Sequence, residues 1–169
     1  IYPPFCVRCG RIGTLFCDRC HTHLNFITTK NLVPSLFRDE KNPVYLENVT
    51  ALCVYDAVLK KVLHQYKYGG VRDLFRPLAY WLYEFASWDA DIITYIPIHK
   101  KRKVERGYNQ AQLLAGELSR LSGIPCVSLL ARPVYKQKQA LSKNKAERLA
   151  KTKNIFTARE NDLDRRLRV

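Results

Sequence analysis

The chain contains the stretch CVRCGRIGTLFCDRC, in which two Cys-x-x-Cys pairs are separated by seven residues. Each pair places two sulfurs on one tight turn, so that four thiolates can converge on a single ion. Four thiolates are a common ligand set of tetrahedral Zn²⁺ in structural sites, and they leave no coordination position open for catalysis. We therefore predict one structural zinc ion bound by Cys6, Cys9, Cys17 and Cys20.

Two redox or disulfide pairs are the alternative use of these four cysteines. Gly10 follows the first pair directly, as expected for a turn that needs positive φ. His21 and His23 are also metal-ligand types, but four cysteines fill the coordination shell, so we expect both histidines at the surface. Cys53 and Cys126 lie singly in apolar stretches and are predicted to be buried thiols. This cysteine usage favours a reducing, cytoplasmic location.

The composition is compatible with a folded core, because 47% of the 169 residues are hydrophobic. A run of about 18 apolar residues is absent, so we expect no membrane span. The opening residues IYPPF do not resemble a signal peptide. Because the chain starts at Ile1 and contains no Met, we expect that its initiator is missing from this sequence.

The positive charge is concentrated in one third of the chain. The net charge is +14, and residues 99–153 hold 14 lysines and arginines against three acidic residues. A block of one sign favours an anionic partner such as nucleic acid, phosphate or an acidic protein. The alternative is an ordinary solvated basic face.

Apolar periodicity predicts alternating strands and helices in the longer, second part of the chain. The run 90–99 is continuously apolar, which is typical of a strand buried on both faces of a parallel sheet. We expect residues 91–98 to be central and these isoleucines to be nearly inaccessible: Ile92, Ile93, Ile96 and Ile98. The other predicted elements are a strand over 48–55, a helix through Val58 and Tyr66 that ends at 67–70, a helix over 74–86, a helix over about 109–122 and a strand near 126–131.

The segment HKKRKVERGYNQ (99–110) is predicted to be a basic loop that enters the amino end of a helix. Free N–H groups at a helix amino end favour an anion. Asn109 is a candidate N-cap, and Gly107 would let the backbone approach a ligand. Arg102 and Arg106 can each bind phosphate oxygens with two N–H groups. The alternative is a capped helix with a solvated basic turn.

Several motifs in this order resemble the ComF family. The resemblance covers nearly the whole chain, and its most specific part is RGYNQ following PIH. The matching stretches are the two cysteine pairs, YKYGG (66–70), IPIH (96–99), Arg102, RGYNQA (106–111), Gln139, Leu141-Ser142, Glu147-Arg148 and Phe156.

The resemblance implies an α/β fold: a zinc ribbon with its linker over 1–47, then a phosphoribosyltransferase-like domain over 48–169 with a parallel sheet. It also implies a role in natural competence, with single-stranded DNA as ligand and a helicase-like ATPase as partner. The residues implied to bind phosphate or nucleic acid are Lys100, Lys101, Arg102, Arg106, Gly107, Tyr108, Asn109 and Arg148.

The chain also departs from the family pattern. It has no Asp-Asp pair and no Thr-Thr-Gly loop, which related transferases use for the ribose phosphate, and Lys151 stands where the family commonly has Asn. We therefore expect the transferase-like domain to be incomplete at its C-terminal end, and enzymatic activity stays open.

Two functional hypotheses follow. In the first, the protein handles incoming DNA, with Tyr108 and Tyr135 available for base stacking. In the second, it is an active phosphoribosyltransferase that binds phosphoribosyl pyrophosphate with Mg²⁺, and the segment 132–155 closes as a lid. A purely zinc-dependent interaction module would leave the basic segment without a cause.

Overall fold

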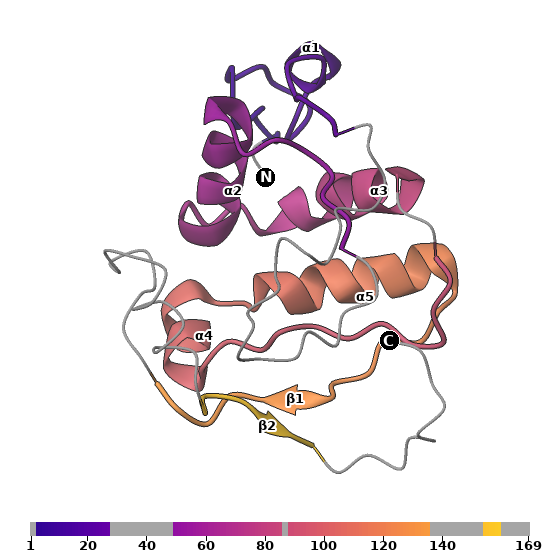
Figure 1. The fold of residues 1–169 in the computed structure, drawn as a ribbon. Helices are drawn as coiled ribbons and strands as arrows, with labels where there is room; N and C mark the ends of the chain where they lie inside the picture. The colour runs from indigo at the N-terminus through magenta and orange to yellow at the C-terminus, as the bar shows by residue number, and fades with distance from the viewer. Residues whose placement is uncertain (1–2, 28–48, 86–87, 136–153, 160–169) are drawn as a thin grey trace, which may run out of the picture. The chain divides into compact units, whose positions relative to one another are not determined.

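The structure, a computed structural model, describes residues 3–27, 49–85, 88–135 and 154–159. The chain divides into two compact units, Ile1–Trp88 and Asp89–Val169 (Figure 1). The cysteine-rich segment thus belongs to the same unit as the first long helices. The domain boundary predicted between residues 47 and 48 lies outside the described residues and stays a prediction.

The described part of the first unit contains the helices α1 (Asp18–His21), α2 (Ala57–Tyr68) and α3 (Phe75–Phe85), with a 3₁₀ turn before α3 (Arg72–Leu74). Helix α2 begins where the Asp56 side chain accepts a hydrogen bond from the Leu59 amide, at 2.9 Å. This cap satisfies one of the amide donors that a helix start leaves open. The apolar face predicted for α2 is confirmed, because Val62 and Tyr66 are fully buried.

Aromatic rings from α3 join the cysteine segment to the core of the first unit. The rings of Phe16 and Trp81 meet edge to face with centroids 5.3 Å apart, and Phe26 stacks on Phe85 at 4.9 Å. Pairs of this kind add to the stability that area burial gives. The ring centroids of His21 and Trp81 lie 5.0 Å apart, and His21 is half-buried. The expectation that His21 is a surface residue is therefore wrong.

The strand predicted over 48–55 is reduced to a single antiparallel bridge between Cys53 and Phe26. Two backbone hydrogen bonds flank the bridge: the Ile27 amide donates to the Leu52 carbonyl, and the Val54 amide donates to the Asn25 carbonyl, both at 2.9 Å. These bonds connect the end of the cysteine segment to the start of the helical part of the unit.

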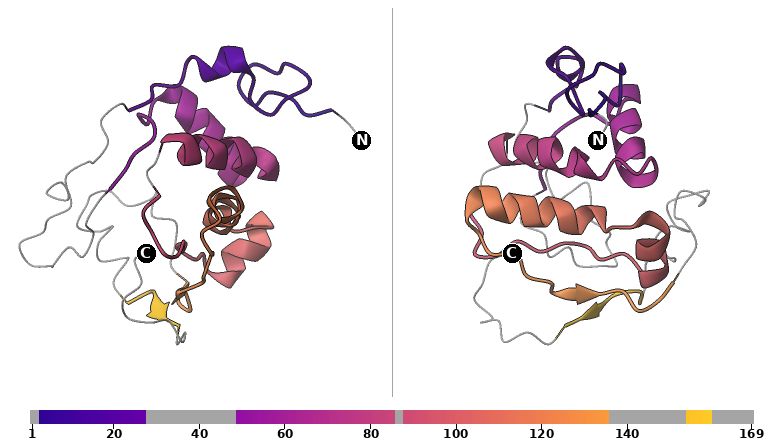
Figure 2. Two further views of the ribbon diagram at one scale, coloured as in Figure 1. Left: turned by 90° about the vertical axis from the view of Figure 1, so that its right-hand side faces the viewer. Right: turned by 180° about the vertical axis from the view of Figure 1, so that it is seen from behind.

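The second unit contains α4 (Lys100–Arg106), α5 (Gln110–Ser122), β1 (Leu130–Ala131) and β2 (Thr157–Ala158). The two strands are antiparallel, with Leu130 opposite Ala158, and are seen side by side in the right-hand view of Figure 2. Helix α5 confirms the helix predicted over 109–122. Its inner face carries the buried Ala115 and Leu118.

The parallel sheet predicted around residues 91–98 is not present among the described residues. One parallel bridge joins Ile93 to Cys126, where Ile93 accepts from Val127 at 2.8 Å and donates to Pro125 at 2.9 Å. Ile92 and Ile93 are buried as predicted, but Ile96 is 56% exposed and Ile98 half-buried. Pro97 provides a physical reason why strand pairing does not continue along this segment, because it has no N–H to donate to a neighbouring strand.

The segment predicted as a basic loop is helical over Lys100–Arg106. The His99 side chain caps α4 by accepting from the Lys101 amide at 3.2 Å, and Gly107 ends it in the left-handed region with φ of 81°. Within the described ranges, no helix has both the length and the apolar character needed to cross a membrane.

Candidate metal centre and basic segment

The first cysteine pair lies in a hairpin-like turn closed by an antiparallel bridge between Phe5 and Ile12. The Cys6 amide donates to the Arg11 carbonyl, and the Gly10 amide donates to the Cys6 carbonyl, both at 2.8 Å. Gly10 has φ of 80°, as its sequence position predicts. The turn therefore brings the first two sulfurs to the same side.

The second pair lies at the start of α1. Cys17 occupies the N-cap position, and the Cys20 amide donates back to the Cys17 carbonyl at 2.8 Å. Phe16, directly before this pair, is buried against Trp81. Local backbone bonds and core packing thus hold the second pair in place.

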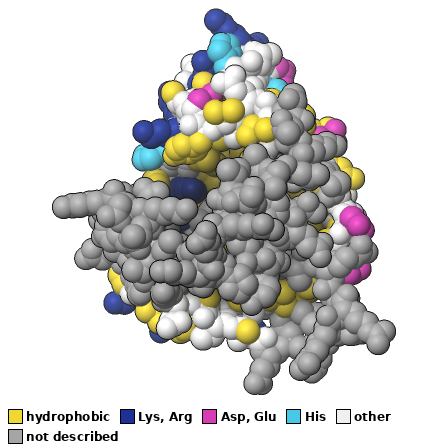
Figure 3. Space-filling model, viewed as in Figure 1, with side chains coloured by type: hydrophobic (Ala, Val, Ile, Leu, Met, Phe, Trp, Pro, Cys, Tyr) yellow, Lys and Arg dark blue, Asp and Glu magenta, His cyan; other side chains and the backbone are white. Residues whose placement is uncertain are grey.

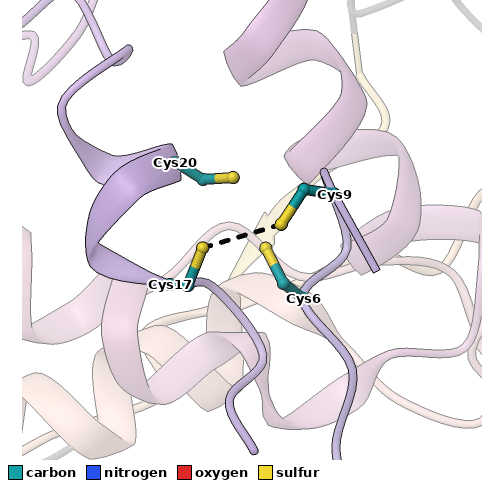
Figure 4. A group of neighbouring side chains, drawn as sticks. All are labelled: Cys6, Cys9, Cys17 and Cys20. Carbon is teal, nitrogen blue, oxygen red and sulfur yellow. Dashed lines mark hydrogen bonds between the residues drawn. The ribbon is translucent and has the colours of Figure 1, made fainter. Parts of the chain in front are cut away.

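The four sulfur atoms converge, as Figure 4 shows, and all lie within 4.8 Å of one another. The Sγ atoms of Cys9 and Cys17 are 3.7 Å apart. Zinc–sulfur bonds of about 2.3 Å in a tetrahedron place neighbouring sulfurs about 3.8 Å apart. None of the four cysteines forms a disulfide in this structure, and the spacing of their sulfurs is compatible with one bound metal ion.

The cluster is mostly enclosed by protein. Cys6, Cys17 and Cys20 are buried, whereas Cys9 is exposed. Nη1 of Arg8 donates to Sγ of Cys20 at 3.6 Å, which places a positive charge beside the sulfurs. A set of four thiolates around a divalent ion carries net negative charge, so Arg8 is well placed to offset it.

The thiol pKa values differ within the cluster. Burial by itself raises the pKa of Cys6, but N–H groups of the backbone, first those of Cys9 and Cys17, outweigh it and lower the pKa to about 6. Burial raises the pKa of Cys20 to about 12, against the opposing hydrogen bond from Arg8. A bound cation would stabilise the thiolate form at both positions.

The remaining cysteines, Cys53 and Cys126, are not members of this cluster. Cys53 and Cys126 are half-buried, close to the prediction of buried thiols. Burial, aided by the charge of Asp56, raises the pKa of Cys53 to about 11, and burial also raises the pKa of Cys126. Both are therefore protonated at neutral pH and poor nucleophiles.

The basic residues predicted to bind phosphate lie mainly on α4. Lys100 and Lys101 are exposed, while Arg102 and Arg106 are half-buried. Nη1 of Arg106 donates to Oε1 of Gln110 at 2.6 Å, which links α4 to the first turn of α5. Arg148 lies outside the described residues.

The junction between α4 and α5 is more buried than the sequence predicts. Tyr108 and Asn109 are 7% and 5% exposed. Asn109 is the N-cap of α5, as predicted, and its Oδ1 accepts from the Ala111 amide at 3.1 Å. Tyr108 offers little exposed ring for base stacking, and its burial depends on packing that sequence periodicity does not report. The Ala111 amide at the start of α5 already donates to the Asn109 side chain, so it is not available to an anion.

Tyr135, which follows β1 in the chain, lies beside two of these basic residues, Lys101 and Arg102. Tyr135 is 42% exposed, and its ring centroid lies 5.4 Å from Nζ of Lys101 and 5.8 Å from Cζ of Arg102. The His99 ring meets it edge to face at 5.2 Å. Tyr135 is thus the predicted stacking residue that keeps an accessible ring.

Sequence reasoning missed one cation of this region, Arg132, which follows β1 directly. Its Cζ lies 5.5 Å from the ring centroid of Phe156, and its Nε is buried. The only sequence signal for Arg132 is its position within the basic segment 99–153. Lys and Arg side chains, dark blue in Figure 3, are visible at several places on the face drawn there.

Chemically, the two sites differ. The four thiols can supply all four ligands of one tetrahedral metal ion, which leaves no open coordination position for catalysis. The basic residues with Tyr135 offer charge and an aromatic face to an anionic, planar-ringed ligand. Comparison of the chain with protein-family models, with curated proteins and with solved structures gives no match.

Proposed function

We propose that the protein binds single-stranded nucleic acid through α4 and the residues around it. The observation that carries the proposal is the combination of exposed Lys100 and Lys101 with half-buried Arg102 and the accessible ring of Tyr135. Cationic side chains follow the phosphates of a single strand, while an aromatic ring stacks on a base without regard to its identity. Together these groups supply both halves of such an interface.

The sequence motifs support a more specific form of this proposal. The resemblance to the ComF family suggests that the nucleic acid is incoming single-stranded DNA during natural competence, and that a helicase-like ATPase is the partner in the cytoplasm. In this proposal the phosphoribosyltransferase-like fold serves as a DNA-binding scaffold. The Gly107 turn and the Asn109 cap then set the direction of α4 relative to α5.

The metal in this proposal is zinc, and its role is structural. Four thiols are the donor set that Zn²⁺ favours, and the spacing of Cys9 and Cys17 matches tetrahedral geometry. The metal would fix the hairpin-like turn and α1 against α3, where Phe16 meets Trp81. It would take no part in binding the nucleic acid directly.

An active phosphoribosyltransferase is the second candidate. It is favoured by the parallel bridge between Ile93 and Cys126, because a basic segment following such a strand-like stretch is where open α/β folds hold phosphates. In that case the ligand is phosphoribosyl pyrophosphate with Mg²⁺, bound by Arg102 and Arg106. The lid predicted over 132–155 lies largely outside the described residues.

Titration of a labelled oligonucleotide at two salt concentrations tests the proposal. The double variant Arg102→Ala/Arg106→Ala should bind more weakly, and its affinity should depend less steeply on salt, by about one counterion for each phosphate that the variant no longer binds. The control Arg72→Ala/Arg76→Ala removes two exposed arginines with the same spacing from the first unit. Equal binding by both double variants would reject the basic segment as the site, and Mg²⁺-dependent competition by pyrophosphate would favour the transferase.

A further inference from the structure

Arg8 belongs to the turn of the first cysteine pair, but its side chain reaches the second pair. Its Nη1 atom donates to Sγ of Cys20 at 3.6 Å, across a separation of 12 residues in the chain. Sulfur is larger than oxygen, so N–H donors bond to it at longer distances than to a carbonyl. Cys20 is 1% exposed, so water has little access to replace this donor.

A side chain of α2 holds the backbone of Arg8. Nζ of Lys61 donates to the Arg8 carbonyl at 2.9 Å. Lys61 directly precedes Val62, which is fully buried, so the core of the first unit fixes this part of α2. A series of contacts therefore leads from the core through α2 and Arg8 to a sulfur atom of the cluster.

The second contact between α2 and the cysteine segment lies at the start of the helix. Nδ2 of Asn25 donates to Oδ2 of Asp56, the N-cap residue of α2, at 2.7 Å. Asn25 follows α1 closely in the chain, whereas Arg8 precedes it. The helix thus contacts the cysteine segment on both sides of the second cysteine pair.

A charged donor at sulfur changes how firmly a thiolate cluster retains its metal. Four thiolates around a divalent cation carry net negative charge, and their mutual repulsion is strong where protein excludes water. A guanidinium that donates to one sulfur offsets part of this charge without taking a coordination position. Groups that bond to metal ligands in this way commonly change metal affinity by 10 to 100 times.

We propose that Arg8 is a positioning residue of the metal centre, and that Lys61 couples metal retention to α2. Arg8 acts through Cys20 and does not touch the metal. The inference rests on the metal assignment within the proposed function, and it adds two residues from outside the ligand set. It also gives α2 a part in retaining the metal, although this helix supplies no ligand.

Competition for Zn²⁺ between the full chain and a chromophoric chelator tests the role of Arg8. Arg8→Leu should weaken zinc binding by about tenfold or more, because the buried sulfur loses its charged donor. Arg8→Lys keeps a charged donor and should recover part of the affinity. The control Arg19→Leu removes the same charge from an exposed residue next to Cys20 and should change affinity by less than about twofold. Equal affinities of Arg8→Leu and Arg19→Leu would overturn the proposal.

Co²⁺ in place of Zn²⁺ provides a signature that a merely structural role would not produce. A hydrogen bond lowers the energy of the sulfur lone pairs, so its loss should move the thiolate-to-cobalt charge-transfer band to longer wavelength. This shift should appear in Arg8→Leu, be smaller in Arg8→Lys and be absent in Arg19→Leu. A weaker band at an unchanged wavelength in Arg8→Leu would show that the turn is merely disordered, and would reject the proposal.

The coupling to α2 is tested by two adjacent lysines. Lys61→Leu should release zinc to excess chelator about two to five times faster, a smaller effect than that of Arg8→Leu because this bond is exposed to water. Lys60→Leu removes the same charge one residue earlier in α2, also from an exposed position, and should release zinc at the unchanged rate. Equal rates in both lysine variants would reject the coupling.

These measurements separate failure of the inference from failure of the proposed function. A chain that takes up neither Zn²⁺ nor Co²⁺ would reject the metal assignment and this inference with it. Tight zinc binding that none of the variants alters would reject the inference alone. Oligonucleotide binding enters none of these readouts, so a chain that binds no nucleic acid would still confirm or reject the role of Arg8.

Discussion

The sulfur atoms of Cys9 and Cys17 lie 3.7 Å apart, although one belongs to a hairpin-like turn and the other to the start of α1. Each turn is set largely by its own backbone hydrogen bonds, and the Val7 amide, which donates to the Leu15 carbonyl at 3.0 Å, links the two. A metal ion at this point would act as a cross-link between them.

Removal of one thiol should therefore release the metal. Purified protein should contain about one zinc ion per chain by elemental analysis, and Cys17→Ser should contain much less, because three thiolates bind far more weakly than four. Cys126→Ser, which changes a half-buried thiol of the second unit, is the control and should keep its zinc. Two disulfides and no metal in the unchanged protein would contradict the assignment.

The cap of α2 should make stability depend on pH. The Leu59 amide, which donates to the Asp56 carboxylate, lowers the pKa of that carboxyl when the protein is folded. The contribution of the charged cap is present above the unfolded pKa of about 3.9 and is lost as pH falls through the lower folded value. Asp56→Asn keeps an acceptor without the charge, so urea unfolding of this variant should lack this pH-dependent component.

Two glycines allow a comparison of helix ends. Gly107 after α4 and Gly123 after α5 have φ of 81° and 77°, and a Cβ at either would meet open space. Alanine at each position should cost about 1 to 2 kcal/mol of unfolding free energy from backbone strain alone. Oligonucleotide affinity should fall only for Gly107→Ala, which alters the end of the basic helix. An equal effect of both variants on binding would speak against α4 as the interface.

Tyr135 should contribute stacking rather than charge. Tyr135→Leu should weaken oligonucleotide binding by about 1 to 3 kcal/mol, while the slope of affinity against salt stays the same. Tyr80→Leu, which removes a similarly exposed ring from α3, is the control and should bind normally. If the Tyr135 variant changes the salt slope instead, its effect passes through Lys101 or Arg102.

Burial along the 90–99 segment gives a test of the fold. Ile92 is 4% exposed and Ile96 is 56% exposed. Ile92→Ala should cost about 2 to 5 kcal/mol in urea unfolding, because it leaves a cavity. Ile96→Ala should stay within about 0.5 kcal/mol, as expected for a surface change. Equal costs would show that Ile96 packs into a core after all.

The sequence predicted the longer helices and the metal cluster because both depend on regular spacing. Helices α2, α3 and α5 carry apolar residues at helical intervals, and the four cysteines follow the spacing of a metal-binding motif. Helix α4 was missed because KKRKVER has a single apolar residue and therefore no apolar face. Its only sequence signals are the cap residues His99 and Gly107.

The interactions that join distant residues were beyond prediction. Nothing in the sequence indicates that Lys101 lies over the ring of Tyr135, or that Arg132 lies over the ring of Phe156. The run 90–99 shows a related difficulty, because an apolar stretch indicates burial but not which partner strand is present. Only Ile93 forms a described bridge there.

The packing of Phe16 against Trp81 gives the protein an optical reporter of its own. Indole emission responds to the polarity and motion of its surroundings, and Phe16 immediately precedes the metal-site residue Cys17. Chelation of the metal should therefore change the fluorescence of Trp81 without any added dye. In Trp81→Phe, where Trp88 remains as the emitter, the same treatment should leave the signal nearly constant.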